Sequence, residues 1–402
     1  MVKIKKINNL VEKIWMILLS LILIIGVASV YYTVHTYLMI IITSCILIIT
    51  VLPQIILMKN KIEVTPPVFI MGIIYIIAGI FLPVFWGKIG LYYIYVVFIL
   101  MPLLFLYTVS LIKSDKLVVF VTMFVKVCII LASISVFIWI FGSTLRLIKP
   151  TGISTFLWGD STRSVNTYFN VYFETQNAGL NLGNIHIGVK NNSIFAEAPM
   201  CCFVYICASI LNEMFVKIKS YRCILVIMIL STLTTTGQIY ITMLALYYLF
   251  NWHPKRKSGY NLKVLMIIIL SSLAAFLIFN MLHMKTGTIS GNDRIRHILN
   301  EWVYFKSSPI YGAGFDVFTN GTSNSIVALL ADGGILLWGL YYFPLIWVVF
   351  HWSINKKEIK LNTVLFTVIF SFTAAQYTPI ALLMIDILFI YYNYGGQYNV
   401  NK

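Results

Sequence analysis

The sequence predicts an all-α integral membrane protein with about 12 transmembrane helices and two long loops on the outer face. Three observations lead to this fold class. Of the 402 residues, 60% are hydrophobic and only 10% are charged, whereas soluble domains have about 25% charged residues. The apolar residues come in blocks near the roughly 20 residues that a helix needs to cross a bilayer. Lysine and arginine residues gather between alternate blocks, as the positive-inside rule describes.

The apolar blocks predict helices in chain order. They are residues 14–32, 36–58, 66–87, 90–112, 117–142, 194–215, 223–235, 237–250, 264–283, 326–352, 361–375 and 378–394. The stretch 223–250 has Lys/Arg clusters on both flanks, so a single crossing would place one cluster outside. Two short helices that turn at Thr236-Gly237 keep both clusters inside, and a turn at Tyr377-Thr378-Pro379 does the same for the last pair.

The distribution of Lys and Arg predicts the orientation. Of the 29 such residues, 19 fall on the side that holds the N-terminus, nine fall on the other side, and Lys126 lies within a span. The excess marks the cytoplasmic side. We therefore expect one polytopic domain over residues 1–402 in the inner (plasma) membrane, with both termini cytoplasmic.

The net charge of +16 does not indicate nucleic acid, because the basic residues lie between apolar blocks and form no stripe with interleaved aromatics. The six cysteines lie in apolar segments and are interpreted as small buried hydrophobes. The six histidines show no metal-binding spacing, so neither a metal site nor a cofactor is expected.

Two segments are too long to be tight turns, and both are predicted on the outer face. The first long loop covers residues 143–193 and the second covers residues 284–325. Loops of this length are uncommon in compact structures unless they are functional or disordered. Both contain aromatic residues, including Trp158 and Trp302, which favours order.

The second long loop contains an amphipathic helix, predicted over residues 293–306. Its apolar positions 295, 298, 299, 302 and 305 form one stripe suited to the membrane surface. Arg294, His297 and Glu301 form the opposite face, which is either a solvated face, as the pattern alone favours, or a cationic shelf for a lipid phosphate. Pro309 to Phe315 then predicts a sharp turn back toward the membrane.

Two acidic residues lie at positions where a carboxylate is costly. Glu197 is just inside the outer end of an apolar helix, and Asp332 is about two turns into another. An intramembrane acid is a functional candidate, although Glu197 is equally compatible with the headgroup zone, where water or Lys190 would satisfy it. Lys126 either snorkels to the cytoplasm or pairs with a buried acid such as Asp386.

These residues together resemble the O-antigen polymerase and ligase superfamily, membrane glycosyltransferases of the GT-C kind. The first long loop ends in a Phe-x-Glu-x-Pro helix start, preceded by Lys190 where the family often has Arg. In the second, Arg294 precedes a Pro-x-x-Gly-x-Gly motif, then Ser323-Asn324, and Asp332 and Gly334 follow in the next helix. Ser323 stands where the family has His, and Asp332 where it has Glu.

The departures bear on the type of enzyme that the resemblance implies. The histidine that Ser323 replaces is the residue usually discussed as catalytic in the ligases, so its absence favours a polymerase. Lys190 keeps the positive charge of the family's Arg but lacks its bidentate fork.

The resemblance implies an enzyme that joins polyprenyl-diphosphate-linked oligosaccharide repeats into capsule, exopolysaccharide or O-antigen chains on the outer face. Catalytic candidates are Glu197 as the base, Asp332 as its alternative, and Arg294 for the diphosphate charge. Candidates for substrate binding are Arg163, Lys190, Arg296, His297, Ser323 and Asn324. Implied partners are membrane lipids, a chain-length regulator and a flippase.

Other functions remain open from the sequence. A ligase would transfer the chain to a terminal acceptor instead of another repeat. A flippase or other transporter would place polar residues at the bilayer midplane, and Lys126 with Asp386 is its best support. A non-catalytic scaffold is disfavoured by the charged, aromatic-rich outer loops.

Overall fold

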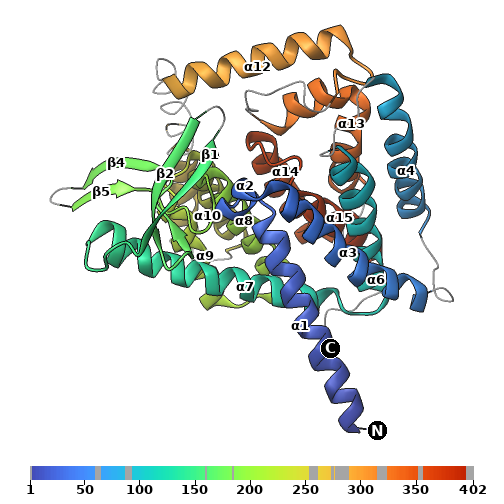
Figure 1. The fold of residues 1–402 in the computed structure, drawn as a ribbon, viewed down its shortest axis with the longest axis horizontal. Coiled ribbons are helices and arrows are strands. Elements are labelled where there is room, and N and C mark those ends of the chain that lie inside the picture. The colour runs from blue at the N-terminus through green and yellow to red at the C-terminus, as the bar shows by residue number, and fades with distance from the viewer. Residues whose placement is uncertain are drawn as a thin grey trace.

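The computed structural model describes residues 2–58, 65–86, 93–158, 161–182, 185–252, 261–272, 276, 289–314, 324–351 and 356–394. This part of the chain is mostly helical (Figure 1). Six of its helices are long and apolar enough to cross a membrane. They are Thr36–Pro53, Pro66–Trp86, Ile94–Lys113, Leu117–Thr144, Ala198–Val216 and Ser325–Phe350. The helical membrane class is thereby supported, and the full count of crossings remains a prediction.

The helices follow the predicted segments closely in most of the chain. They are α1 (Val2–Ile25), α2 (Val30–Val34), α3 (Thr36–Met58), α4 (Pro66–Trp86), η1 (Ile94–Leu100), α6 (Met101–Lys113), α7 (Leu117–Ile138), η2 (Trp139–Thr144), α8 (Ala198–Leu211), η3 (Asn212–Val216), α9 (Lys219–Ser231), α10 (Thr235–Asn251), a helix over Asn261–Ser272, α12 (Ile289–Ser307), α13 (Ser325–Phe350), α14 (Lys357–Phe372) and α15 (Pro379–Tyr394). The three η elements are π-helical and continue an adjoining α-helix. Of the predicted helix 264–283, residues 273–275 and 277–283 lie outside the described residues.

The first predicted span differs from the structure at both ends. Helix α1 begins earlier than predicted and ends at Ile25, and α2 starts a new helix at Val30. Between them Ala28 has a φ of 45°, a left-handed conformation that a helix does not continue through. Ser29 then caps α2 by accepting a hydrogen bond from the Tyr32 N–H at 3.1 Å.

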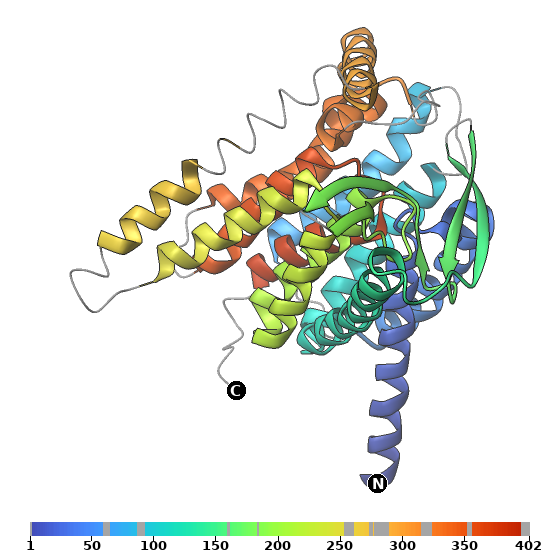
Figure 2. The same cartoon turned by 90° about the vertical axis from the view of Figure 1, so that its left-hand side faces the viewer.

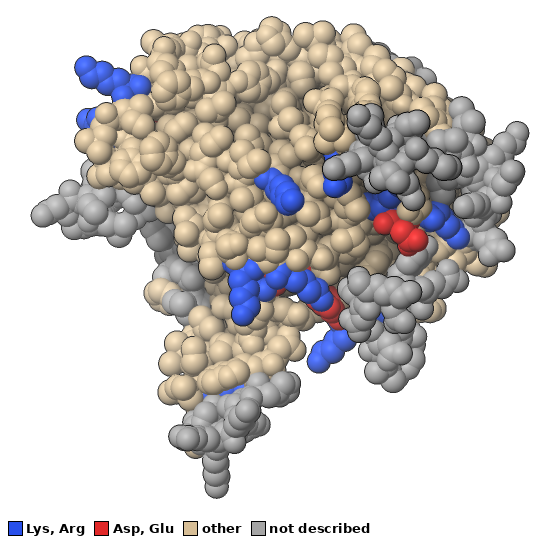
Figure 3. All heavy atoms as spheres, turned by 90° about the horizontal axis from the view of Figure 1, so that it is seen from below, with Lys and Arg blue, Asp and Glu red and all other residues tan. Residues whose placement is uncertain are grey.

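Three of the described cations predicted to be cytoplasmic, Lys113, Lys116 and Lys217, lie at one end of the bundle, which we call the cation end. Lys116 Nζ lies 2.5 Å from Glu12 Oε1, and Lys113 Nζ lies 4.6 Å from the ring centre of Tyr394. Lys217 pairs with Glu358 at 3.3 Å. These contacts join the ends of helices that are far apart in the sequence. Figure 3 views the molecule from below, the side of the α1 N-terminus, and Lys and Arg outnumber the acids on that face.

Both predicted short hairpins are present, and both turn at the opposite end. The turn between α9 and α10 lies near Asn191, whose N–H donates to the Ser231 carbonyl at 3.1 Å. The turn between α14 and α15 meets the start of α13, where Ser325 Oγ donates to the Thr373 carbonyl at 2.5 Å. These four helices have 13 to 17 residues, fewer than the roughly 20 that a full crossing needs.

The first hairpin turns a few residues earlier than predicted. Helix α9 ends at Ser231 and α10 begins at Thr235, so the turn precedes Thr236-Gly237. Thr234 accepts a hydrogen bond from the Gly237 N–H at 3.2 Å and caps α10. A threonine cap satisfies a helix-end donor that would otherwise be buried without a partner.

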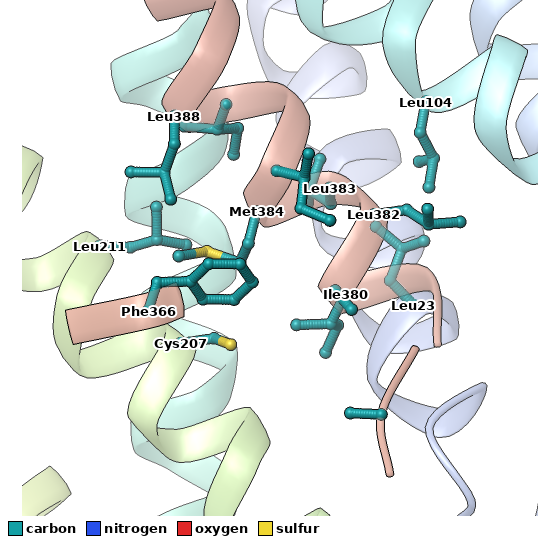
Figure 4. Packing of buried hydrophobic residues seen from close by; sticks show 14 of the residues in the cluster. Leu23, Leu104, Cys207, Leu211, Phe366, Ile380, Leu382, Leu383, Met384 and Leu388 are labelled. Carbon is teal, nitrogen blue, oxygen red and sulfur yellow. The ribbon is translucent and has the colours of Figure 1, made fainter. Parts of the chain in front are cut away.

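Helix α15 is the centre of the hydrophobic core. Ile380, Leu382, Leu383, Met384 and Leu388 are all at most 2% exposed. Figure 4 shows them surrounded by buried side chains from four other helices. These are Leu23 of α1, Leu104 of α6, Cys207 and Leu211 of α8, and Phe366 of α14.

The first long loop is built of strands, so the all-α prediction is wrong for this segment. Strands β1 (Gly152–Trp158), β2 (Ser161–Tyr168) and β3 (Tyr172–Phe173) form an antiparallel sheet in that order. Strands β4 (Asn177–Leu182) and β5 (Ile185–Val189) form a hairpin beside it. The segment is rich in Thr, Val, Ile and aromatic residues, which favour strands over helices. Figures 1 and 2 show both sheets beside the helical bundle.

Candidate functional site

A polar groove of about 500 Å³ lies on the first long loop. Its lining comes from β2, from the connection between β3 and β4, from the start of β4 and from the residue that follows β5. The lining residues are Arg163, Ser164, Val165, Glu174, Thr175, Gln176, Asn177 and Lys190. The structure therefore places Arg163 and Lys190, two candidates chosen from the sequence, in one groove.

The sheet fixes the position of Arg163. Strand β2 pairs with β1 along its whole length, and Arg163 lies opposite Phe156 in the register. Phe156 and Val165 are buried and pack with Phe173 in a small hydrophobic cluster. Because a one-residue slip would move these side chains to the wrong face, the buried pair holds the register.

Glu174 is a groove residue that the sequence reasoning missed. Asn166 Nδ2 donates to its Oε2 at 2.9 Å, and the Tyr168 hydroxyl donates to its Oε1 at 3.1 Å. Burial and, after it, the charge of Glu174 raise the pKa of Tyr168 to about 12. The hydroxyl therefore stays protonated at neutral pH and keeps donating. Both carboxylate oxygens of Glu174 are thus fixed in orientation.

Lys190 is positioned by a buried polar segment that follows it. Asn191, Asn192 and Ser193 are all 0% exposed. Ser135 Oγ donates to Asn191 Oδ1 at 2.5 Å, and Asn191 Nδ2 donates to Ser231 Oγ at 2.9 Å. These bonds tie the end of the loop to α7 and α9. The run of polar residues directly before an apolar helix is the sequence feature that could have indicated this anchor.

Glu197 lies at the start of α8, next to the groove. It is the N-cap residue, with extended backbone angles of −135° and 141°, and it is half-buried. Gln176 lines the groove and its Oε1 accepts a hydrogen bond from the Ala198 N–H at 3.0 Å. Gln176 therefore links the groove to the residue after Glu197. A carboxylate at a helix N-terminus is stabilised in its charged form by the helix dipole.

The Pro-x-x-Gly-x-Gly motif of the second long loop docks against a break in α13. The Ala313 N–H donates to the Ala331 carbonyl, and the Gly314 N–H donates to the Asp332 carbonyl, both at 2.8 Å. On the other side of the break, the Ile335 N–H donates to the Pro309 carbonyl at 2.9 Å. The loop thus satisfies backbone groups that the broken helix leaves open.

The glycines permit this close docking. Gly334 has a φ of 63° inside α13 and breaks the helix there. A Cβ on Gly334 would lie 2.4 Å from the Ile310 carbonyl carbon, and one on Gly312 would lie 2.4 Å from that of Asp332. The motif therefore has a structural role in these contacts, and no phosphate-binding role is needed to explain it.

Asp332 is buried beside this break and is 5% exposed. The Tyr377 hydroxyl, from the turn before α15, donates to its Oδ2. These contacts join α13 to the α14–α15 hairpin, whereas Glu197 lies with the first long loop. Asn324 caps α13, with its Oδ1 accepting from the Val327 N–H at 3.0 Å.

Helix α12 has its faces arranged differently from the prediction. Glu301 is 0% exposed, whereas Ile295, Leu299 and Trp302 are exposed. The prediction of a solvated polar face is therefore wrong at Glu301, which packs on the protein, whereas these three residues of the apolar stripe point away from it. Figure 1 shows α12 lying across the top of the molecule.

The other second-loop candidates are only partly described. Arg296 is exposed and His297 is half-buried on α12. The side chain of Arg294 and the whole of Ser323 lie outside the described residues.

Of the two alternatives for Lys126, the pair with Asp386 is wrong. Lys126 is exposed on α7. Asp386 is 2% exposed and accepts a hydrogen bond from the Tyr75 hydroxyl at 3.4 Å. The hydrogen-bond partner of Asp386 is therefore in α4 and is not Lys126.

Within the described ranges, no three His, Cys, Asp or Glu side chains come together as metal ligands. Comparisons with protein-family profiles, with curated proteins and with solved structures found no match to this chain.

Proposed function

We propose that this protein is a membrane glycosyltransferase of the polysaccharide polymerase type. It joins polyprenyl-diphosphate-linked oligosaccharide repeats on the outer face of the membrane. The donor chain leaves its lipid diphosphate and is passed to a hydroxyl of the next lipid-linked unit. In this proposal the reaction takes place at the end of the bundle opposite the cation end. We call it the loop end, and the groove and Glu197 lie there.

The observation that carries this proposal is the groove beside Glu197. It holds Arg163 and Lys190 in a polar lining and is linked through Gln176 to the start of α8. The two cations offer charge-assisted hydrogen bonds to an anionic group of the substrate. In this proposal the carboxylate of Glu197, at the adjoining helix start, acts on a bound hydroxyl.

The chemistry assigns a separate role to each group. The bond between the anomeric carbon and the diphosphate oxygen breaks, and the oxygen keeps the electron pair. The acceptor hydroxyl oxygen forms the new bond to that carbon, and its proton passes to the Glu197 carboxylate. Cations of the second long loop, Arg294 and Arg296, stabilise the departing lipid diphosphate.

The test is complementation of a strain that lacks the gene. Glu197→Gln, Arg163→Ala and Arg294→Ala are introduced, and surface polysaccharide is separated on a gel while membrane levels are followed by immunoblot. We expect single repeats in place of long chains, because loss of a general base costs about 10²- to 10⁴-fold in rate. The control is Lys149→Ala, an exposed cation of the same loop that does not line the groove.

Two other outcomes would change the assignment. Long chains that stay on the lipid carrier in the deletion strain would indicate a ligase. Repeats that accumulate on the cytoplasmic face would indicate a transporter. The observation that favours a transporter is Asp386, a carboxylate buried between α15 and α4, since transporters bind substrate and ions within the bundle.

A further inference from the structure

The groove on the first long loop has a charge balance that distinguishes between anionic ligands. Its charged lining residues are Arg163, Lys190 and Glu174, so two positive charges face one negative charge. Glu174 is held in place by Asn166 and Tyr168 and cannot swing away without breaking both bonds. A ligand with one negative charge balances this lining. A diphosphate brings more negative charge close to a fixed carboxylate, and like charges at short range repel.

The remaining lining suits a ligand with many hydroxyl groups. Ser164, Thr175, Gln176 and Asn177 supply hydroxyl and amide groups that both donate and accept hydrogen bonds. Most pockets for small molecules are lined mainly by apolar side chains, and this one is mainly polar. Its volume of about 500 Å³ lies within the roughly 300–1,000 Å³ that such ligands occupy.

We infer that the groove is a subsite for a sugar residue that carries a single negative charge, such as a uronic acid. This inference rests on the proposed function and narrows its substrate class. Arg163 pairs with the sugar carboxylate through its planar fork, and Lys190 adds a second cation. Glu174 accepts hydrogen bonds from the ring hydroxyls. The lipid diphosphate is then bound elsewhere, by the cations of the second long loop.

Direct binding tests the subsite on the full-length protein in nanodiscs of phosphatidylcholine. The probes are a labelled tetrasaccharide of alternating glucuronic acid and N-acetylglucosamine and a neutral tetrasaccharide of N-acetylglucosamine. We expect the acidic probe to bind in preference to the neutral one. Arg163→Ala and Lys190→Ala should each weaken it at least about tenfold, the typical loss for a charge-assisted hydrogen bond. Lys149→Ala should leave it unchanged.

Competition separates the possible anions. Glu174→Gln removes the negative charge at nearly constant shape, so binding of inorganic pyrophosphate should strengthen in this variant. The inference is overturned if pyrophosphate displaces the acidic probe from the wild-type groove at a lower concentration than unlabelled acidic tetrasaccharide does. It is also overturned if phosphatidylglycerol in the nanodisc abolishes probe binding, because the groove then takes a lipid headgroup, or if neither tetrasaccharide binds.

The sugar composition of the cell's polysaccharide separates this inference from the proposed function. If the deletion abolishes a polymer that contains no acidic sugar, the polymerase function stands and the acidic subsite is wrong. If the polymer survives the deletion while Arg163→Ala still loses the acidic probe, the subsite stands and the polymerase function is wrong. If the lost polymer has an acidic sugar in its repeat, both are supported.

Discussion

Gly334 and Gly312 lie where two backbones pass each other at a distance that no side chain allows. Each has a positive φ, and each would bring a Cβ to 2.4 Å from backbone of the other segment. The sequence showed a glycine motif but not the helix break that it contacts. The partner backbone lies about 20 residues further along the chain, and spacing alone does not reveal such a contact.

Replacing Gly334 with Ala should therefore destabilise the protein by about 3 kcal/mol, from a strained φ together with the overlap at Ile310. The measurement is the thermal midpoint of the purified protein in detergent. Gly339→Ala is the matched control, since a Cβ there meets nothing within 4 Å. It should be neutral or slightly stabilising, by at most about 1 kcal/mol. Equal losses in both variants would contradict the docking of the second long loop on α13.

The groove shows which part of a site a sequence reveals. Arg163 and Lys190 stood out because charged residues are scarce in this chain. Glu174 did not stand out, because the hydrogen bonds that fix its carboxylate come from Asn166 and Tyr168. The fold of the sheet brings these two side chains to it. Hydrophobic blocks carry no information on such cross-strand contacts, so the binding groups that depend on them were missed.

At the scale of helices and strands, the apolar blocks predicted the helices well and the long loop poorly. Helices α3 and α4 agree with the predicted segments to within a residue, because an apolar block in a membrane must be helical to satisfy its backbone. The first long loop lies outside that constraint. Its alternation of apolar and polar residues is short and irregular, and strands β1 to β5 were not predicted from it.

Asn324 provides a prediction at the start of α13. Its side chain caps the helix through the Val327 N–H, so Asn324→Ala should cost about 1 kcal/mol of stability. Asn324→Asp keeps the capping oxygen and should restore the thermal midpoint. Polymer formation in the complementation strain then separates two roles. Recovery with Asp assigns Asn324 to the cap alone, and continued loss with normal stability assigns it a contact with substrate.

At the scale of the whole molecule, the two ends of the bundle differ in chemistry. The cation end gathers the ion pairs of Lys116, Lys217 and Arg222 with acids on neighbouring elements. The loop end gathers the sheets, α12 and the turns of both hairpins. The Lys/Arg clusters predicted two short helices in each hairpin, so that the chain starts and ends each hairpin at the cation end. The positions of the two turns agree with that prediction. Which end faces the cytoplasm is a separate prediction.

Single cysteines test that orientation in a variant without the six native cysteines. Thr162→Cys on β2 should react with a membrane-impermeant maleimide in intact cells. Ser220→Cys in α9 and Lys357→Cys in α14 should react only after permeabilisation, because the positive-inside rule places the cation end in the cytoplasm. All three positions are exposed, so accessibility of the thiol itself does not limit labelling. Reaction of Ser220→Cys in intact cells would reverse the topology.

The central position of α15 has a consequence for how the chain is made. Among the described helices this one is translated last, yet α1, α4, α6, α8, α13 and α14 all pack against it. Some 250 residues separate the end of α7 from the end of α15, which takes roughly 10–50 s of synthesis at about 5–20 residues per second. During that interval the helices already inserted in the bilayer lack the helix that packs at the centre of their core. A premature stop just before Pro379 would remove the helix at the centre of the core, and the truncated product would be a target for membrane quality control.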